Sequence, residues 1–428
     1  MTDTRSPDSS SQPAEDMALD YKWMARALAL ARKGEALAHP NPMVGAIVVA
    51  NDLEVGRGFH TYDGVKHAEV LALEEAGGRA RGATLYVNFE PCCHAGRTPP
   101  CTDAIRAAGI SRVVAAMPDP NPRVSGRGFQ ILKDAGIVVV SGVLEVDARR
   151  LNEAFARWIR TGRPLVTLKV ALTLDGRVAL DGKRDAALKA RATRSATRAA
   201  ARREESATER WITSEVSRAE VQRMRHASDA VLTGIGTVLA DDPMLTDRTG
   251  LARRRPLVRV VLDSRLRLPL RSKLARTAAG DVLVVTRASE NSVRAFALEY
   301  SGVEMLRIEG PGSSRKARPR ERGTGLRLDQ VVAALGELDM LAVMIEAGPR
   351  VVSAALSAGV VDKAVLFYAP RFQGGSALPM LPVRDGHGAR RPVSHAAVRV
   401  PELSDVTLRR FGPDFAVEGY LHDVYGDH

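Results

Sequence analysis

Cysteine is scarce in this sequence, and its few cysteines are close neighbours. Cys92, Cys93 and Cys101 are the only three, and they share one proline-containing stretch. So few thiols cannot form the disulfide framework of a small secreted protein, whereas free thiols suit a reducing compartment in which they can bind metal. We therefore expect a cytoplasmic protein whose cysteines are available as metal ligands.

Aromatic residues and long apolar runs are also scarce. Phe, Trp and Tyr make up only 4% of the chain, which leaves few platforms on which nucleic-acid bases could stack. No apolar run approaches the roughly 20 residues that span a bilayer, so no membrane partner is expected. The polar residues 1–16 are expected to form a disordered leader.

The excess of positive over negative charge predicts an anionic partner. The formal net charge is +12, which suits a phosphorylated small molecule, a nucleotide cofactor or nucleic acid. Much of the excess lies in two stretches that resemble exposed insertions, residues 183–203 and 315–322. With so few aromatic residues, this distribution favours a ligand that carries phosphate, and nucleic acid is not the partner we expect.

The length of 428 residues exceeds what one hydrophobic core usually serves, so two domains are expected. Apolar runs alternate with stretches of helical periodicity in both halves, which predicts two α/β domains. The Gly162-Arg163-Pro164 turn is the expected boundary, between a first domain at 17–162 and a second at 163–428. An insertion at about 182–210 interrupts the second domain.

In the first domain the pattern predicts a helix-sheet-helix sandwich. Helices are expected near residues 21–34, 67–76, 101–109 and 128–135, and strands near 44–50, 83–89, 112–117 and 137–143.

One stretch of the first domain contains the components of a catalytic zinc site. His67, Cys92 and Cys101 supply one imidazole and two thiolates, and three protein ligands leave the fourth tetrahedral position for water. Glu69 follows His67 by two residues and can take the proton that an activated water loses, without binding the metal itself. This combination predicts hydrolytic deamination, with one zinc ion in the domain.

A structural zinc site is the alternative interpretation of the same residues. Structural sites close their coordination with four protein ligands, and Cys93 or His94 could supply the fourth. The spacing of the cysteines also bears on the substrate. Nucleic-acid and nucleoside deaminases carry the pattern PCxxC, whereas eight residues separate Cys92 from Cys101 here.

The second domain offers a phosphate-binding position. Glu346, Ala347, Gly348 and Pro349 follow an apolar strand and precede a helix, where α/β sheets commonly bind ligands and helix N-termini bind anions. The GxGxxG fingerprint of dinucleotide-binding domains is absent, so composition and spacing leave both an anion site and a purely structural α/β domain open.

These motifs together resemble a known bacterial family. The chain is similar to the bifunctional riboflavin-biosynthesis proteins, in which a pyrimidine deaminase is fused to a uracil reductase, from about Tyr21 to the C-terminus. The resemblance rests on NPMVG, HAE, EPCCHAGRTPPC, DPNPRVSGRG, LKVALTLDGR, WITSE, GIGTVLADDPMLT, LDS, EAGP and YAPRFQGG. It implies a cytidine-deaminase-like α/β/α sandwich followed by a dihydrofolate-reductase-like α/β domain.

The resemblance also implies both reactions and their cofactors. The first domain would use zinc to deaminate 2,5-diamino-6-(5-phosphoribosylamino)pyrimidin-4-one, and the second would use NADPH to reduce the ribosyl group of the product. Glu69 would be catalytic in the deaminase. Residues placed by the resemblance around the first substrate are Asn41, His60, His94, Arg97 and Asp119.

The reductase residues are likewise implied by resemblance. Those placed at NADPH are Ala171, Trp211, Thr237, Asp241, Ser264 and the segment from Gly348. Those placed at the second substrate are Lys169, Arg225, Leu245, Arg248 and Glu346.

Three residues depart from the family pattern. Cys93 and Thr173 stand where serine is usual, and Glu209 stands where a serine usually precedes the tryptophan by two residues. A zinc deaminase that binds RNA through its basic insertion, and a deaminase with an inactive reductase-like scaffold, are therefore retained as competing functions. The family forms homo-oligomers, so a dimer or tetramer is expected.

Overall fold

The computed structural model describes residues 12–180, 211–289, 291–308, 325–374, 377–381 and 401–426. It divides into two compact units, one formed by residues up to Gly162 with Ala252–Arg255, the other by Arg163–Leu251 and Pro256–Gly426. The expected insertion at about 182–210 and the first eleven residues of the expected leader lie outside the described residues.

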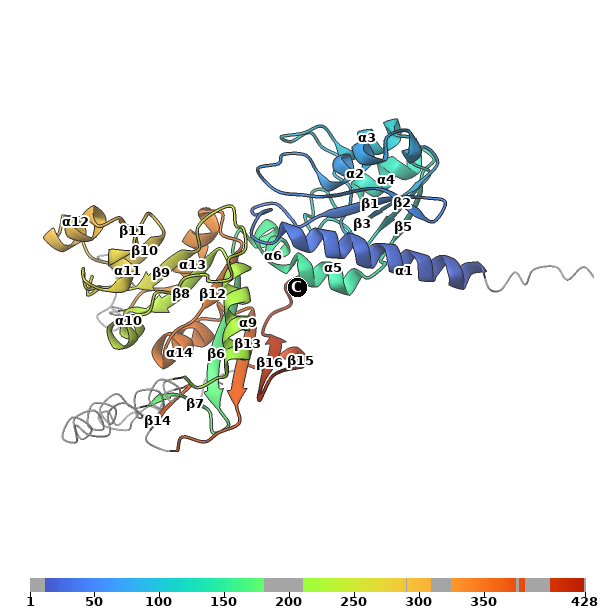
Figure 1. Cartoon of the computed structure of the whole chain (residues 1–428). Coiled ribbons are helices and arrows are strands. Elements are labelled where there is room, and N and C mark those ends of the chain that lie inside the picture. Colours follow the sequence, from blue (N-terminus) through green and yellow to red (C-terminus); the bar gives the residue numbers. More distant parts are fainter. Residues whose placement is uncertain are drawn as a thin grey trace, which may run out of the picture. The chain divides into compact units, whose positions relative to one another are not determined.

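The first unit is built on a five-stranded sheet in the order β2-β1-β3-β4-β5 (Figure 1). β1 pairs antiparallel with both β2 and β3, and β3, β4 and β5 run parallel. Its central strands are short apolar runs, buried on both faces as expected for a covered sheet. The strands are β1 (Gly45–Ala50), β2 (Leu53–Phe59), β3 (Thr84–Val87), β4 (Arg112–Ala115) and β5 (Val138–Ser141).

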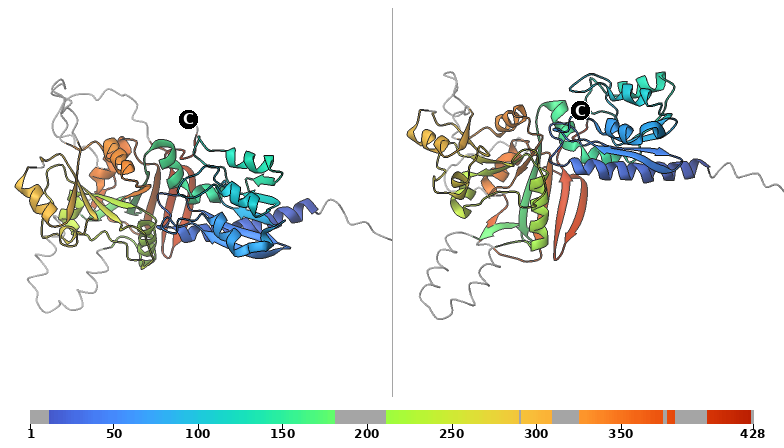
Figure 2. Two further views of the ribbon diagram at one scale, coloured as in Figure 1. Left: turned by 90° about the horizontal axis from the view of Figure 1, so that it is seen from above. Right: turned by 45° about the horizontal axis from the view of Figure 1, so that its top comes forward.

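Helices cover both faces of this sheet. α2, α3 and α4 lie on one face, and α1 and α5 on the other (Figures 1 and 2). The helices are α1 (Gln12–Ala31), α2 (Ala68–Ala76), α3 (Cys101–Ala107), α4 (Arg127–Asp134), α5 (Glu145–Leu151) and α6 (Glu153–Thr161), with short 3-10 turns at Arg32–Gly34 and Gly77–Ala80.

Glycines let two helices approach the sheet closely. A Cβ on Gly45 of β1 would lie 2.3 Å from the carbonyl oxygen of Ala27 in α1, and one on Gly58 of β2 would lie 2.4 Å from that of Ala68 in α2. Gly45 pairs with Phe59, the residue next to Gly58, and side chains alternate along a strand. The two glycines therefore face opposite sides, and α2 lies directly against β2.

α1 begins earlier than the helical pattern near Tyr21 suggests. It starts at Gln12, and Pro13 is compatible with a first turn because no intrahelical partner is needed there for its missing N–H. The helix is tied to the sheet at Asp20, which accepts hydrogen bonds from Tyr86 at 2.9 Å and from both terminal nitrogens of Arg112 at 2.7 Å.

The second unit contains a nine-stranded sheet in the order β11-β10-β9-β8-β12-β6-β13-β16-β15. The seven strands from β11 to β13 are parallel, and the hairpin β15–β16 adds two antiparallel strands at one edge. These strands are β6 (Leu165–Thr173), β8 (Ala230–Gly234), β9 (Val258–Leu262), β10 (Val282–Thr286), β11 (Val303–Arg307), β12 (Ala342–Ile345), β13 (Lys363–Ala369), β15 (Ser404–Phe411) and β16 (Asp414–Tyr420), while β7 (Arg177–Leu180) pairs with β14 (Ala377–Pro379).

Two apolar cores lie on opposite faces of this sheet. Successive residues of β8 alternate between them, because Val231 belongs to one core and Leu232 to the other. The core that contains Leu232 is covered by α13 and α14. The core that contains Val231 is covered by α10, α11 and α12, and α9 covers β13 and β16. The helices are α9 (Glu215–His226), α10 (Ile235–Asp241), α11 (Lys273–Arg276), α12 (Val293–Tyr300), α13 (Leu328–Glu337) and α14 (Pro349–Ser357).

Within the described ranges, none of the helices combines the length and the apolar character that crossing a membrane requires. This agrees with the lack of long apolar runs in the sequence.

Candidate active sites

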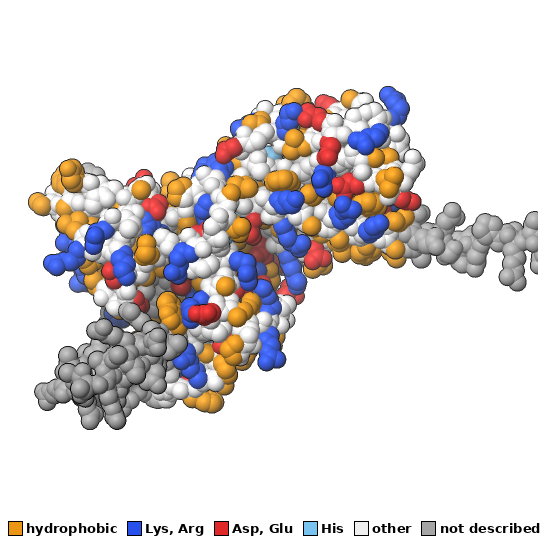
Figure 3. Space-filling view, in the orientation of Figure 1, with side chains coloured by type: hydrophobic (Ala, Val, Ile, Leu, Met, Phe, Trp, Pro, Cys, Tyr) orange, Lys and Arg blue, Asp and Glu red, His pale blue; other side chains and the backbone are white. Residues whose placement is uncertain are grey.

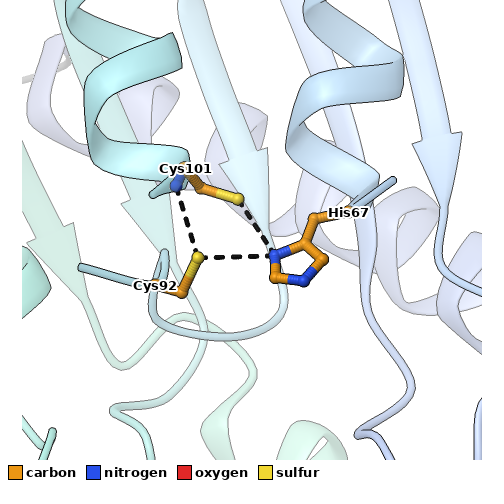
Figure 4. Close-up of side chains that lie close together, drawn as sticks. All are labelled: His67, Cys92 and Cys101. Atoms are coloured by element: carbon orange, nitrogen blue, oxygen red, sulfur yellow. Dashed lines mark hydrogen bonds between the residues drawn. The ribbon is translucent and has the colours of Figure 1, made fainter. Parts of the chain in front are cut away.

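His67, Cys92 and Cys101 converge at the ends of three chain segments in the first unit (Figure 4). His67 caps the N-terminus of α2, Cys101 is the first residue of α3, and Cys92 lies in the loop after β3. The imidazole Nδ1 lies 3.2 Å from the sulfur of Cys101 and 3.4 Å from that of Cys92. The three ligand atoms lie within 4.8 Å of one another, so the site fits one zinc ion with an N-and-two-S donor set.

The site is electrostatically prepared to hold a thiolate. The pKa of Cys92 is lowered, because its sulfur receives hydrogen bonds from the side chain and backbone of Cys101 and from His67, although burial opposes this. The backbone N–H of Cys101 donates at 3.3 Å. These donors come from a helix start and a helix cap, where amide dipoles also favour negative charge.

Glu69 lies in the first turn of α2 and is 3% exposed. Burial, followed by the nearby charge of Cys92, raises its pKa to about 7. A carboxyl group in this range can exchange a proton near neutral pH, which is what a general acid and base requires. The structure thus places an acid-base group in the same helical turn as the metal ligand His67.

Asn41 and His60 form a hydrogen-bonded pair beside the metal ligands. The ring of His60 lies edge-on to that of His67, with 5.3 Å between centroids. His60 Nδ1 lies 3.0 Å from the carbonyl oxygen of Lys66, so it carries the proton, and Nε2 accepts from the amide of Asn41 at 2.9 Å. Burial lowers the pKa of His60, which keeps the ring neutral in this arrangement.

The other three residues expected at the first substrate lie in two loops. His94 and Arg97 are exposed between Cys92 and α3, and Arg97 donates to the carbonyl of Tyr62 at 3.0 Å while its guanidinium lies 4.4 Å from the Tyr62 ring centroid. Asp119 follows β4, and burial raises its pKa to about 6, although the hydrogen bond from the backbone N–H of Asn121 opposes this rise.

In the second unit the structure brings three expected substrate residues together. Glu346, directly after β12, receives a 3.2 Å contact from Lys169 of β6 and hydrogen bonds of 3.0 and 2.8 Å from Arg225 of α9. Burial alone would raise the pKa of Glu346, but the two cations outweigh it and lower the pKa to about 2. The carboxylate thus holds two cationic side chains at the carboxyl edge of the sheet.

Leu245 and Arg248 belong to a loop that α9 holds. Arg225 also donates to the carbonyl of Thr246 at 3.0 Å, and the backbone N–H of Arg248 donates to Gln222 at 2.9 Å. Leu245 is buried with φ of 53°. The exposed Arg248 side chain is therefore carried by a loop whose backbone is fixed on both sides.

The residues expected at NADPH are distributed over several elements. A Cβ on Gly348, the N-cap of α14, would lie 3.7 Å from the hydroxyl of Thr237, so these two are neighbours at adjoining helix starts. Gly348 stands at the N-terminus of α14, where helix amides attract phosphate groups, so its position is compatible with the cofactor phosphate that is expected there. Ala171 lies in β6, Asp241 ends α10, Ser264 follows β9 and Trp211 is exposed.

Two asparagines that the sequence did not single out hold the loop of Asn41. Buried Asn88 accepts from the N–H of Gly45 at 2.8 Å and donates to the carbonyl of Met43 at 3.0 Å. Asn152, buried between α5 and α6, accepts from the N–H of Met43 at 2.8 Å. An amide directly after an apolar strand is the signal that could have indicated Asn88, whereas nothing local marks Asn152.

The first unit is a layered α/β domain that brings together a histidine, a glutamate and two cysteines. The second unit has a largely parallel sheet, with cationic side chains where the carboxyl ends of its strands lie. Together these features define a zinc deaminase fused to a reductase. Residues 17–117 match the cytidine and deoxycytidylate deaminase zinc-binding region, and residues 164–417 match the RibD C-terminal domain.

Individual relatives agree over nearly the whole length. The riboflavin biosynthesis protein RibD of Aquifex aeolicus is 41% identical over 357 residues, covering 83% of this chain and 88% of its own, and that of Escherichia coli is 35% identical, covering 92% and 97%. The solved structure of Acinetobacter baumannii RibD, form 1, matches with a TM-score of 0.72 at 34% identity, covering 94% of this chain and 99% of that one. The chain belongs to the RibD family of riboflavin biosynthesis proteins.

Family membership confirms the expected fold, activity and cofactors. The chain is a bifunctional enzyme of riboflavin biosynthesis, with a zinc-binding, cytidine-deaminase-like domain and an NADPH-dependent reductase domain. The two competing functions, an RNA-binding deaminase and a deaminase with an inactive scaffold, are not favoured.

Proposed function

We propose that the first unit deaminates 2,5-diamino-6-(5-phosphoribosylamino)pyrimidin-4-one and that the second reduces the ribosyl group of the resulting uracil to ribityl with NADPH. A solved Thermotoga maritima protein that is 32% identical, with a TM-score of 0.72, is described as having both activities. The observation that carries the proposal is the convergence of His67, Cys92 and Cys101 beside buried Glu69.

Glu69 is the proton carrier of the first reaction. When bound by the three ligands, zinc supplies the Lewis acidity that makes water a nucleophile near neutral pH. Glu69 takes one proton from that water and passes it to the ring nitrogen, and it then moves the remaining proton of the new hydroxyl group to the leaving amine, so that water is consumed and ammonia is released. Its pKa of about 7 suits both halves of this transfer.

The surrounding side chains position the first substrate. Asn41 presents an amide held by neutral His60 next to the metal ligands, which suits recognition of the pyrimidine edge. Asp119 accepts from substrate amino groups, and the side chains of His94 and Arg97 supply hydrogen-bond donors toward the 5-phosphate. The exposed position of Arg97 suits a phosphate that remains partly in water.

In the second reaction the protein orients and polarises while NADPH supplies the hydride. The ribosyl ring opens to an imine. The C1 carbon of this imine accepts the hydride, and the imine nitrogen accepts a proton. Lys169 and Arg225, held by Glu346, face the substrate, Leu245 packs against it, and Arg248 binds its phosphate. Thr237 and Gly348 hold the cofactor with Ala171, Trp211, Asp241 and Ser264 around it.

The protein is proposed to act in the cytoplasm as a homo-oligomer, dimer or tetramer, with small molecules rather than nucleic acid as its partners. On the face shown in Figure 3, Lys and Arg side chains are interspersed with acidic and apolar ones and do not gather into one basic patch. A polynucleotide would require a continuous basic surface with aromatic platforms.

A coupled assay with Glu69→Gln tests the proposed roles. The substitution removes the proton carrier but none of the metal ligands, so ammonia release should fall by about 10²- to 10⁴-fold with zinc content unchanged. NADPH oxidation with supplied deaminated product should continue at the rate of the unsubstituted enzyme. Persistent ammonia release would exclude Glu69 as the proton carrier, and failure of the unsubstituted enzyme to oxidise NADPH would exclude the reductase assignment.

A further inference from the structure

A buried carboxylate next to the zinc-site loop has no role in the reaction described so far. Glu90 follows β3 and directly precedes Pro91 and Cys92, and it is 3% exposed. Withdrawing a carboxylate from water is costly unless hydrogen bonds replace those lost, so its partners indicate what it serves.

Within the described part of the chain, the three hydrogen-bond partners of Glu90 are backbone N–H groups of residues 119–128, which form the loop after β4 and the first turn of α4. Its Oε2 accepts from Asp119 at 3.0 Å and from Gly126 at 2.9 Å, and its Oε1 accepts from Gly128 at 2.8 Å. Hydrogen bonds from amides to a carboxylate are stronger than those between neutral groups. One side chain thus pins both ends of residues 119–128, the motif DPNPRVSGRG that the sequence comparison with the family singled out.

Two glycines, Gly126 and Gly128, make the contact between residues 119–128 and Glu90 possible. Gly126 has φ of 81°, which few other residues adopt, and it caps the start of α4. A Cβ on Gly128 would lie 2.2 Å from the carbonyl oxygen of Pro91 and 3.1 Å from Glu90 Oε1. The close approach to Glu90 therefore requires glycine at position 128, and the left-handed backbone at position 126 favours glycine there.

Among the residues whose backbone Glu90 binds, Asp119 is the one proposed to contact the substrate. Its own N–H is one of the three donors to Glu90, and its Oδ1 accepts from the N–H of Asn121 at 2.8 Å, so both its backbone and its carboxyl group are oriented. We propose that Glu90 is a positioning residue of the deaminase, which fixes the 119–128 loop so that Asp119 meets the amino-pyrimidine substrate. This rests on the proposed role of Asp119 in binding that substrate.

The test compares Glu90→Gln, Asp119→Asn and the double variant in the full-length, zinc-loaded enzyme. The side-chain NH2 group of a glutamine would face backbone N–H donors of the loop. Because it cannot accept their hydrogen bonds, part of the loop would be released. We expect KM for the diaminopyrimidinone substrate to rise about 10- to 100-fold, while kcat changes less than about 3-fold. Zinc content and NADPH oxidation with deaminated product should not change. Glu75→Gln is the matched control, because Glu75 also accepts a backbone N–H, from Arg57 at 2.8 Å, but on the surface of the unit.

The double variant decides whether Glu90 acts through Asp119. If it does, Glu90→Gln should add little to the KM of Asp119→Asn, because both remove one interaction. Effects that multiply, or a kcat that falls together with zinc content, would overturn the inference and assign Glu90 to the Cys92 loop. An Asp119→Asn enzyme with unchanged KM would instead refute the proposed role of Asp119, and the inference with it.

Gly128→Ala provides a second route if Glu90→Gln does not fold. It leaves the carboxylate in place and displaces the loop through the contact with Pro91. The same rise in KM and the same lack of additivity with Asp119→Asn are expected, and an unchanged KM would contradict the inference.

Discussion

Burial favours a raised pKa at both Glu69 and Glu346, yet the pKa values of these two carboxyl groups shift in opposite directions. At Glu69 the nearby charge of Cys92 adds to burial, and the two outweigh the opposite effect of His67, so its pKa rises to about 7. Glu346 is near Lys169 and Arg225, which outweigh burial and lower its pKa to about 2. The first group can therefore exchange protons at neutral pH, whereas the second stays ionised and holds two cations.

Glu346 should make the stability of the enzyme depend on acid pH. Its pKa in the folded chain, about 2, lies below the roughly 4.3 of an unfolded glutamate, so its stabilisation is present above pH 4.3 and is lost as the pH falls toward 2. Urea unfolding between pH 5 and pH 2 should show a smaller loss of stability in Glu346→Gln than in the unsubstituted enzyme.

Glu299→Gln is the control for this comparison. Glu299 pairs with Arg307 at 3.3 Å on the surface, and its loss should change the free energy of unfolding by less than about 0.5 kcal/mol. An identical pH dependence in Glu346→Gln and the unsubstituted enzyme would contradict the linkage.

At the scale of elements, the deaminase site depends on how α2 lies against β2. His67 and Glu69 are both set by the start of α2, and Gly58 allows the backbone of that helix to approach the strand. The other two ligands come from the loop after β3 and from the start of α3. The metal site is thus assembled at the ends of elements packed on one sheet face, where small displacements alter the ligand geometry.

Gly58→Ala should disturb both stability and metal binding. The added Cβ would lie 2.4 Å from the carbonyl oxygen of Ala68, so α2 must move away from β2. Overpacking of this kind costs about 1–3 kcal/mol, and zinc affinity should fall with it. Urea unfolding and competition with a chromogenic chelator would measure the two effects. Gly78→Ala is the control, since a Cβ there meets nothing within 4 Å; equal behaviour of both variants would refute the packing argument.

At the scale of the whole molecule, the two activities use separate sets of residues. The zinc ligands and Glu69 all precede Gly162, and the residues proposed for reduction all follow Arg163. Each unit has its own sheet and its own buried apolar residues. The activities should therefore respond independently to changes at either site.

Removal of zinc should separate the two reactions. Dialysis against a chelator should abolish ammonia release, and added zinc should restore it, because the ligands are thiolates and imidazole. NADPH oxidation with supplied deaminated product should keep its rate throughout. Parallel loss of reduction in the chelated enzyme would show that the reductase also depends on the metal, contrary to the separation of residues described here.

The sequence by itself determined the two α/β folds and the zinc and NADPH chemistry, and it marked the candidate metal ligands and the candidate proton carrier. His67, Glu69 and Cys92 are recognisable because their roles depend on residue type and short spacing, and family membership confirms the chemistry that those motifs predicted. The apolar strands were predictable for a similar reason, since burial on both faces leaves a continuous local run. The individual substrate and cofactor residues remain predictions.

Only the tertiary structure decided which distant side chains support these groups. Glu90 reaches Gly128 across 38 residues, Asn152 reaches Met43 across 109, and Glu346 reaches Lys169 across 177. Such partners have no fixed separation along the chain, because sheet order and helix packing bring them together rather than any local periodicity. The acid-base character of Glu69 and the permanent charge of Glu346 likewise follow from burial and neighbouring charges, which arise only when the chain folds.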